Sequence, residues 1–177
     1  MKDAHPSLIV LIGLMGCGKS SVGRELARLS GWKFVDTDKE IEKTAGLKIA
    51  EIFAQKGEAE FRRMEREAVA RAVREEPEAI LSLGGGAFQD EESRKLLLEK
   101  SRVFYLQASA DCLYERVKAD TTRPLLRCDD PKRALKGLLE KRAPFYRQAH
   151  VVMDAENDPP SRIAARIWRT FERKGKG

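Results

Sequence analysis

The sequence predicts a single α/β domain built on a parallel sheet, and three observations support this prediction. The chain has 177 residues, enough for one well-filled core of this class and too few for two. Short apolar runs alternate along it with amphipathic segments, an order typical of βαβ units. No internal repeat, low-complexity segment or domain linker interrupts that order. We therefore expect one domain over residues 1–177.

The apolar runs have the length of buried strands, and the segments between them have helical periodicity. In one long segment, Phe61, Met64, Ala68 and Ala72 fall on one face of a helix. Short apolar runs flanked by polar or turn-forming residues predict five strands: Leu8–Ile12, Lys33–Val35, Ala79–Leu83, Val103–Leu106 and His150–Met153.

The first strand leads into a phosphate-binding loop. Residues 13–20 read Gly-Leu-Met-Gly-Cys-Gly-Lys-Ser and fit the pattern G-x-x-x-x-G-K-[ST], which arises by chance in about 1% of such chains or fewer. The glycines let backbone N–H groups turn toward a ligand, and the positive end of the following helix faces the same small volume as Lys19. The Ser20 hydroxyl is placed to reach Mg²⁺. We expect this loop to bind a nucleoside triphosphate.

Two carboxylates, Asp36 and Asp38, come where the second strand ends. Thr37 and Glu40 have the spacing of a capping box with Thr37 as the N-cap, so Asp38 would stabilise the helix dipole and have a lowered pKa. Because ligands bind at the carboxyl ends of strands, the two carboxylates can instead serve Mg²⁺ and a substrate hydroxyl. Asp38 would then be a weak base that mainly orients the hydroxyl. Asp154, which also follows an apolar run, stays open as a second candidate for the metal.

Further along the chain come a glycine tract and several separated arginines. Gly84, Gly85 and Gly86 directly follow a strand and would let backbone N–H groups approach a ligand closely, although a flexible turn is the alternative. The polar segment 119–131, with its two prolines, is typical of a mobile lid, and an ordinary surface loop is the alternative. A guanidinium group suits a substrate carboxylate or a transferring phosphoryl group, whereas each arginine alone is more often a surface charge. The candidates are Arg62, Arg123 and Arg147.

Composition narrows the class of ligand. The net charge is +6, but basic residues are interspersed with acidic ones, so we expect anionic small molecules rather than nucleic acid. The longest apolar run is too short to span a membrane, and the first residues lack the apolar segment of a signal peptide. The three cysteines are far apart and fit no metal-binding spacing, which predicts free thiols and a cytoplasmic location.

Taken in order, these motifs resemble those of the shikimate kinase family, small P-loop phosphotransferases similar to nucleoside monophosphate kinases. The match runs from Leu8 to about Trp168, and the ordered combination is far more specific than the loop alone. The segments that carry it are residues 13–20, Phe34–Asp38, Gly57–Arg62, Gly84–Gly86, Arg123–Leu126 and Arg142–Arg147.

The resemblance implies both a fold and a reaction. The fold is a five-stranded parallel sheet in the order 2-3-1-4-5, with helices on both faces and a mobile lid over about residues 119–131. The reaction is transfer of the γ-phosphoryl group of ATP to the 3-hydroxyl of shikimate. Its products are shikimate 3-phosphate and ADP, in aromatic amino acid (chorismate) biosynthesis. The implied assembly state is a monomer.

The resemblance also implies a role for each matched residue. Lys19, Asp38 and Arg123 would be catalytic, with Lys19 on the β- and γ-phosphates, Asp38 at the acceptor hydroxyl and Arg123 over the γ-phosphate. Ser20 would ligate Mg²⁺ directly, and Asp36 would hold its water shell. Further nucleotide contacts would come from Gly13, Gly16, Cys17, Gly18, Ser21, Arg116 and Pro159, the last two beside adenine. Shikimate would be held by segment 37–65, with contacts from Asp38, Arg62, Gly84, Gly85, Gly86 and Arg147.

Other functions stay open at this point. A related kinase of another small hydroxy acid, such as gluconate, would keep the loop but would not need Arg62 together with three glycines. A catalytically silent nucleotide-binding regulator is disfavoured because four residues are intact: Lys19, Ser20, Asp38 and Arg123. A guanine-specific switch is disfavoured because the sequence contains no N-K-x-D motif. A nucleoside monophosphate kinase is disfavoured because the acceptor region lacks the base-recognition segments of that family.

Overall fold

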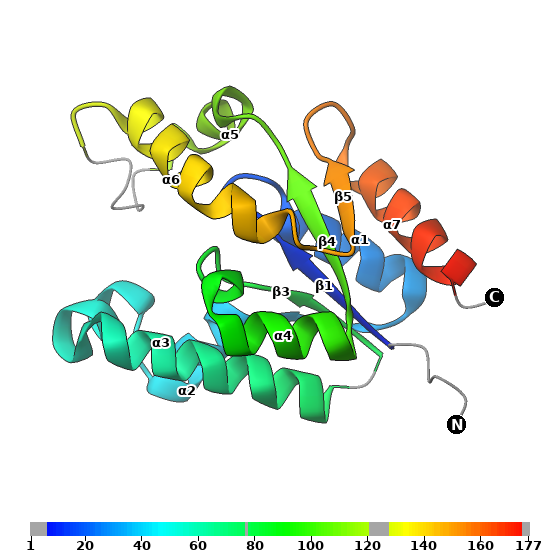
Figure 1. Cartoon of the computed structure of the whole chain (residues 1–177), viewed down its shortest axis with the longest axis horizontal. Helices are drawn as coiled ribbons and strands as arrows, with labels where there is room; N and C mark the ends of the chain where they lie inside the picture. The colour runs from blue at the N-terminus through cyan, green and yellow to red at the C-terminus, as the bar shows by residue number, and fades with distance from the viewer. Residues whose placement is uncertain (1–6, 77, 121–127, 175–177) are drawn as a thin grey trace.

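A computed structural model describes residues 7–76, 78–120 and 128–174 of the chain (Figure 1). Within these residues, strands alternate with helices. The strands are β1 (Leu8–Ile12), β2 (Lys33–Asp36), β3 (Ala79–Ser82), β4 (Arg102–Gln107) and β5 (Val151–Asp154). The helices are α1 (Lys19–Ser30), α2 (Thr37–Ala45), α3 (Ile49–Glu75), α4 (Glu91–Lys100), α5 (Ala110–Val117), α6 (Pro131–Tyr146) and α7 (Pro160–Lys174), with a 3₁₀ turn, η1 (Ala87–Gln89), after β3.

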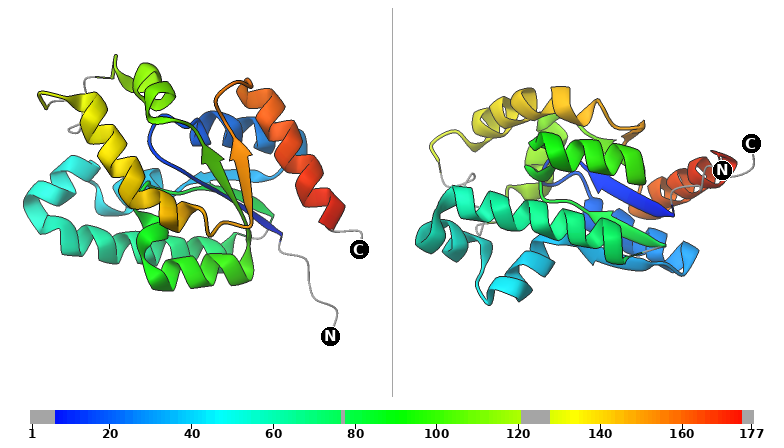
Figure 2. Two further views of the ribbon diagram at one scale, coloured as in Figure 1. Left: turned by 45° about the horizontal axis from the view of Figure 1, so that its top comes forward. Right: turned by 60° about the horizontal axis from the view of Figure 1, so that its bottom comes forward.

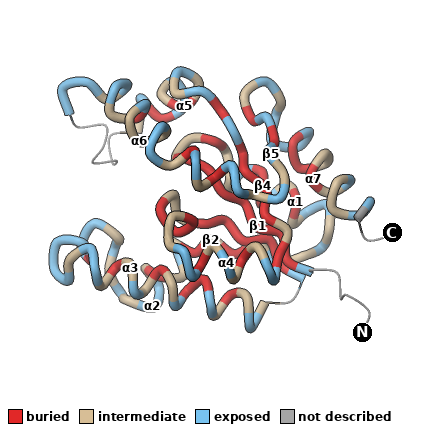
Figure 3. The backbone as a smooth tube through the Cα atoms, in the orientation of Figure 1, coloured by how far each residue is buried: buried red, intermediate tan, exposed pale blue. Residues whose placement is uncertain are grey.

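The described strands form one parallel sheet in the order β2-β3-β1-β4-β5, which confirms the order that the family resemblance implied. Strand β1 is central: Val10 lies opposite Leu81 of β3 and Val103 of β4. Every residue of β1 and β3 is buried, because helices cover both faces of a parallel sheet. Figure 3 shows the buried positions concentrated along these central strands.

Helices on both faces give the molecule three layers (Figure 2). Helices α1 and α7 pack against each other on one face, where Trp32 makes edge contacts with Trp168 and Phe171, each with ring centroids 5.3 Å apart. Helices α4 and α6 lie on the opposite face, in front of the sheet in Figure 1. Because all strands run the same way, the loops that follow them gather at one edge of the sheet.

Helices α2 and α3 form their own packed pair at the β2 side of the sheet, with a separate apolar cluster made of Ile41, Ile52, Phe61 and Ala68. This packing confirms the helical face that the sequence predicted, with Phe61 and Ala68 buried on it. The backbone of α3 kinks at Gly57, where φ is 82°. The kink lets one long segment bend around the cluster, since glycine adopts this conformation without steric cost.

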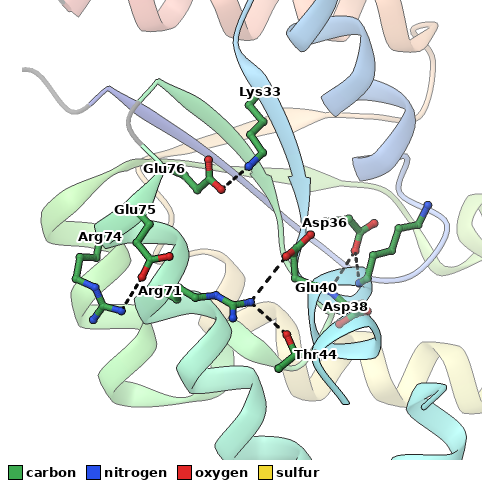
Figure 4. A network of polar contacts seen from close by, with 10 residues as sticks. Lys33, Asp36, Asp38, Glu40, Thr44, Arg71, Arg74, Glu75 and Glu76 are labelled. Atoms are coloured by element: carbon green, nitrogen blue, oxygen red, sulfur yellow. Dashed lines mark hydrogen bonds and ion pairs between the residues drawn. The ribbon is translucent and has the colours of Figure 1, made fainter. Parts of the chain in front are cut away.

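Polar contacts also hold α2 against α3, as Figure 4 shows. The Arg71 guanidinium of α3 lies 3.8 Å from the Glu40 carboxylate and 3.5 Å from the Thr44 hydroxyl, both on α2. At the other end of β2, Lys33 pairs with Glu76 just after α3, at 2.5 Å. Exposed pairs of this kind contribute little energy individually. The Arg71 contacts orient α2 on α3, and the Lys33–Glu76 pair joins the start of β2 to the end of α3.

The start of α2 differs from the capping box that the sequence predicted. Asp36 is the N-cap, and its carboxylate accepts the Asp38 N–H at 3.1 Å (Figure 4). Thr37 is buried instead, and its hydroxyl donates to the Ser82 carbonyl (3.2 Å) and accepts the Gly84 N–H (3.3 Å). The prediction was wrong because the Thr37 hydroxyl finds partners on the neighbouring strand, which spacing along the sequence does not show.

Two further expectations concern membranes and thiols. Across residues 7–76, 78–120 and 128–174, no helix is long and apolar enough to cross a membrane. Cys17, Cys112 and Cys128 form no disulfide, as the sequence predicted, with Cys17 buried and Cys128 exposed. Noncovalent packing therefore holds these elements together.

Two helical glycines give a paired test of this packing. A methyl group on Gly23 of α1 would collide with the Phe34 ring, whereas one on Gly137 of α6 meets no described atom within 4 Å. We expect Gly23→Ala to lower the free energy of unfolding by about 1–3 kcal/mol through overpacking. We expect Gly137→Ala to raise it by about 0.5–1 kcal/mol through helix propensity. Urea unfolding measures both, and effects of the same sign would contradict the packing.

Candidate active site

A cleft of about 790 Å³ opens at the carboxyl ends of the strands. Its walls come from the loop after β1, the starts of α1 and α2, the glycine tract after β3, and the segment after β5. Because parallel strands bring these loops to one edge of the sheet, residues far apart in the sequence line one space. Lys19, Asp38 and Gly84 are among them.

The phosphate-binding loop forms one end of this cleft. Gly16 and Gly18 have φ angles of 83° and 94°, which glycine adopts without steric cost. Gly18 is the N-cap of α1, and in the described structure no side chain caps this helix and no acidic residue lies in its first turn. The first N–H groups and the positive end of the dipole are therefore open to an anion. The Lys19 ammonium donates to the carbonyls of Gly13 (2.7 Å) and Leu14 (3.3 Å), so it already lies at the loop.

Ser20 and Asp36 lie side by side in the same end of the cleft. The Ser20 hydroxyl donates to Asp36 Oδ2 across 3.4 Å, which joins the first turn of α1 to the end of β2. A hydroxyl and a carboxylate supply oxygen ligands, the kind that Mg²⁺ prefers. Within the described residues, no group of three or more His, Cys, Asp or Glu side chains could hold a metal ion. Ser20 and Asp36 supply two oxygen ligands of six, so phosphate oxygens and water would have to complete the coordination of a bound Mg²⁺.

Asp154, the other metal candidate, lies apart from this pair. It is exposed at the end of the edge strand β5, and its Oδ1 accepts the N–H of Glu156 at 2.9 Å. It does not line the cleft, although the next residue, Ala155, does. The geometry therefore favours Asp36.

Asp38 lies in the cleft beside a second carboxylate. Its Oδ1 is buried and has no hydrogen-bond partner among the described residues. Loss of hydration, followed by the negative charge of Asp36, raises the pKa of Asp38 from 3.8 to about 6, against the opposing effect of Lys19. The lowered pKa that the sequence predicted is wrong, because burial of Asp38 beside Asp36 outweighs the effects of Lys19 and Arg62. Asp38 is still mainly ionised at neutral pH, but it is a stronger base than we expected.

The glycine tract leaves room for charged side chains from three other elements. A Cβ atom placed on any of these glycines would collide with the end of such a side chain. It would lie 2.5 Å from Asp38 Oδ1 if placed on Gly84, 2.7 Å from Arg142 Nη1 if placed on Gly85, and against Arg62 Nη1 if placed on Gly86. None of the three glycines is among the described residues with positive φ. Close approach, rather than a tight turn, therefore requires glycine here.

Arg62 of α3 is held in place by two carboxylates. It pairs with Glu65 at 2.7 Å and with Glu58 at 3.3 Å. Glu65, which the sequence analysis did not single out, is only 3% exposed. Burial raises its pKa, while Arg62 opposes the rise. The i, i+3 spacing of Arg62 and Glu65 was the available signal for this pair, and their contact orients the guanidinium group beside the glycine tract.

The structure places Arg142, rather than Arg147, in the cleft. Arg142 lines it, and its buried Nε has no hydrogen-bond partner among the described residues. Arg147 is exposed just after the last turn of α6 and does not line it. Five positions along a helix correspond to about 140° of rotation, so the two side chains project in different directions. Because both arginines belong to one sequence motif, the motif alone could not distinguish them.

Arg116 connects two walls of the nucleotide end. From α5 it donates to the carbonyls of Ala155 (2.7 Å) and Glu156 (2.9 Å), and more weakly to Gly16 of the phosphate-binding loop (3.4 Å). It lines the cleft, as does Pro160, next to the predicted contact Pro159. Arg116 therefore fixes the distance between the loop and the segment that follows β5.

The other predicted site residues divide into two groups. Those that line the cleft are Gly16, Cys17, Gly18, Lys19, Ser20, Ser21, Asp36, Asp38, Gly84, Gly85 and Arg116. Those that do not are Gly13, Arg62, Gly86, Arg147 and Pro159, although Arg62 and Gly86 contact each other next to it. Arg123 and residues 121–127 of the predicted lid lie outside the described residues.

This arrangement is that of a small-molecule kinase, and comparisons with known proteins define which one. The family model for shikimate kinase matches residues 15–172, a span that holds most of the phosphate-binding loop, both carboxylates and the glycine tract. The chain belongs to the shikimate kinase family. Membership carries the P-loop kinase fold and an ATP-dependent phosphotransferase activity.

Individual family members match nearly the whole chain. A shikimate kinase from Thermodesulfovibrio yellowstonii is 40% identical over 169 residues, covering 96% of this chain and 97% of that one. One from Caulobacter vibrioides is 46% identical, covering 94% and 82%. The structure of a shikimate kinase from Acinetobacter baumannii in complex with shikimate has a TM-score of 0.91 and 33% identity, covering 99% and 97%. A gluconokinase from Sinorhizobium meliloti covers 96% of each chain with a TM-score of 0.57 and 21% identity, which shows likeness of fold alone.

The pKa of Asp38 predicts how stability depends on pH. Because the folded-state pKa of about 6 lies above the ordinary aspartate pKa of 3.8, ionised Asp38 destabilises the native state fully above pH 6 and not below about pH 4. In protein free of nucleotide and metal, we expect Asp38→Asn to raise the free energy of unfolding by about 2–3 kcal/mol at pH 8. The gain should shrink to near zero at pH 4.

Denaturant unfolding at several pH values measures this dependence. Asp154→Asn is the matched control, because it neutralises an exposed carboxylate at the end of another strand. A gain from Asp38→Asn that does not change with pH would contradict the buried, ionised state of Asp38.

Proposed function

We propose that this protein transfers the γ-phosphoryl group of ATP to the 3-hydroxyl of shikimate, giving shikimate 3-phosphate and ADP. Family membership supports the reaction and its place in aromatic amino acid biosynthesis. The observation that carries the proposal is a single cleft that joins a phosphate-binding loop to a buried carboxylate with a guanidinium group beside it. A donor and an acceptor can therefore meet there.

The acceptor end suits a small hydroxy acid. Arg62 and Arg142 lie against neighbouring glycines, and two guanidinium groups can bind one carboxylate through charge-assisted hydrogen bonds. Asp38 lies against the third glycine, where its unpartnered Oδ1 can accept a hydrogen bond from a substrate hydroxyl. Binding the carboxylate at one end thus presents a hydroxyl at the other.

Asp38 has two tasks in the transfer. Phosphoryl transfer passes through a loose transition state, so alignment and positive charge matter more than a strong base. Asp38 orients the attacking hydroxyl toward the γ-phosphate and accepts its proton late in the step. Its raised pKa makes the second task easier than it would be for an exposed aspartate.

At the donor end, Lys19 exchanges its carbonyl partners Gly13 and Leu14 for oxygens of the β- and γ-phosphates. Ser20 and Asp36, which lie side by side, would hold Mg²⁺, Ser20 directly and Asp36 through water. The ion would supply positive charge against the phosphate oxygens. Arg116, at the nucleotide end of the cleft, would lie beside the adenine. The proposed role of Arg123 at the γ-phosphate concerns a residue outside the described ones.

We also propose that the protein acts as a monomer in the cytoplasm. One chain brings the phosphate-binding loop and the buried Asp38 carboxylate into the same cleft, as activity of a monomer requires. Three cysteines without a disulfide support a reducing compartment.

ADP release tests the proposed function. The protein is assayed in Mg²⁺-ATP with shikimate, gluconate, AMP or no acceptor. We expect shikimate alone to stimulate ADP release, Lys19→Ala to abolish the stimulation, and Asp38→Asn to lower turnover about 100-fold or more. Stimulation by gluconate or AMP without shikimate would overturn the assignment. Near-normal turnover of Asp38→Asn would remove its catalytic role.

Arg142 and Arg147 are a matched pair for testing the carboxylate contact. Arg142→Ala should raise KM for shikimate about 30-fold, because a charge-assisted hydrogen bond is lost, and leave KM for ATP within about twofold. Arg147→Ala removes an exposed guanidinium near the end of the same helix and should change neither KM by more than about twofold. Steady-state kinetics with each substrate varied in turn measures both. A larger effect of Arg147→Ala would assign the carboxylate to Arg147.

A further inference from the structure

Tyr146, the last residue of α6, is buried beside the glycine tract. Its hydroxyl donates to the Gly85 carbonyl at 2.5 Å. Its ring packs on Tyr105 of β4, with centroids 5.1 Å apart. Burial raises the pKa of Tyr146, so the hydroxyl remains a donor at neutral pH. A fixed side chain on α6 therefore holds one peptide group of the tract.

This hydrogen bond determines where the next N–H points. In a trans peptide, the carbonyl of one residue and the N–H of the next point in opposite directions, and the described chain has no cis peptide bonds. With its carbonyl held toward α6, Gly85 directs the Gly86 N–H away from that helix. On the other side, the Thr37 hydroxyl accepts the Gly84 N–H at 3.3 Å. The carbonyls of Gly84 and Gly86 accept backbone N–H groups of the following turn, at 3.1 and 3.0 Å. The Gly85 carbonyl, in the middle of the tract, is held instead by the Tyr146 hydroxyl.

Anchoring matters because glycine loses more backbone freedom on ordering than other residues. Three glycines in a row would sample several peptide orientations if nothing held them. The N–H groups of Gly85 and Gly86 make no hydrogen bond to another described residue, and Gly84 and Gly85 line the cleft. These N–H groups are available to oxygens of an acceptor only while the peptide groups keep this orientation.

We propose that the Tyr146 hydroxyl is a positioning group for the acceptor, which holds the glycine tract in the orientation that binds shikimate. This inference rests on the proposed function. Arg142 lies one turn before Tyr146 on the same helix, and its guanidinium group lies against Gly85. Helix α6 therefore supplies both a carboxylate contact and the anchor of the tract, so loss of the anchor disturbs the acceptor end and spares the nucleotide end.

Tyr146→Phe tests this role, because it removes the hydroxyl and keeps the ring. Tyr105→Phe is the matched control: it removes a hydroxyl from the adjacent buried ring, which makes no hydrogen bond to the tract among the described residues. We expect Tyr146→Phe to raise KM for shikimate about tenfold, equivalent to about 1.4 kcal/mol. KM for ATP should stay within about twofold. Equal rises in both KM values, or no change beyond that of the control, would overturn the proposal.

Amide resonances of the ligand-free protein separate this proposal from the proposed function. In ¹⁵N–¹H spectra, Tyr146→Phe should shift or broaden the signals of Gly85 and Gly86 and leave those of Gly16 and Gly18 in place. This readout needs no substrate, so it reports on the anchor even if wild-type protein fails to phosphorylate shikimate. Unchanged Gly85 and Gly86 signals would show that the hydroxyl does not position the tract. A wild-type protein inactive with shikimate would refute only the proposed function and the acceptor assigned from it.

Discussion

Charged side chains from α2, α3 and α6 converge on the glycine tract, where side chains on Gly84, Gly85 or Gly86 would occupy their places. This absence of side chains lets a carboxylate and two guanidinium groups share one small surface. The sheet places this surface beside the phosphate-binding loop. Because β3 pairs with β1 in parallel, the loops that follow these two strands lie next to each other. The acceptor surface and the phosphate-binding loop are thereby placed within one cleft, as transfer between two bound substrates requires.

The two helices that begin at this cleft, α1 and α2, differ in how their first N–H groups are capped. Helix α1 has no side-chain cap within the described structure, which leaves its positive end for phosphates. At the start of α2, the Asp36 carboxylate accepts the N–H groups of Asp38 and Lys39. This end of the helix therefore presents carboxylates to the cleft, and not free N–H groups. One result is a buried, ionised Asp38 with a raised pKa, which lowers stability. Contacts around the site keep α2 in place despite this cost. The Thr37 hydroxyl of α2 donates to β3, and Arg71 of α3 contacts side chains of α2.

Much of this could be read from the sequence, for identifiable reasons. Apolar periodicity predicted the strands and the buried face of α3, and the phosphate-binding pattern predicted the loop because its glycine spacing reflects backbone geometry. What failed depended on contacts between distant segments. The Thr37 hydroxyl donates to a neighbouring strand. Burial raises the pKa of Asp38. The direction of α6 brings Arg142, rather than Arg147, to the cleft. The role of Tyr146 could not be predicted from the sequence, because an aromatic residue in a helix is typical of the core. Only the structure shows that its hydroxyl contacts the glycine tract.

Phosphorus NMR of the reaction product tests most directly whether this cleft transfers a phosphoryl group to shikimate. With Mg²⁺-ATP and shikimate, the γ-phosphate signal should be replaced by the signal of one phosphate monoester, coupled to the proton on the carbon that carries the 3-hydroxyl, together with an equal amount of ADP. Formation of inorganic phosphate alone would contradict the acceptor role of Asp38 and the glycine tract. A γ-phosphate signal that persists with shikimate but is lost with gluconate would assign the cleft to a different hydroxy acid.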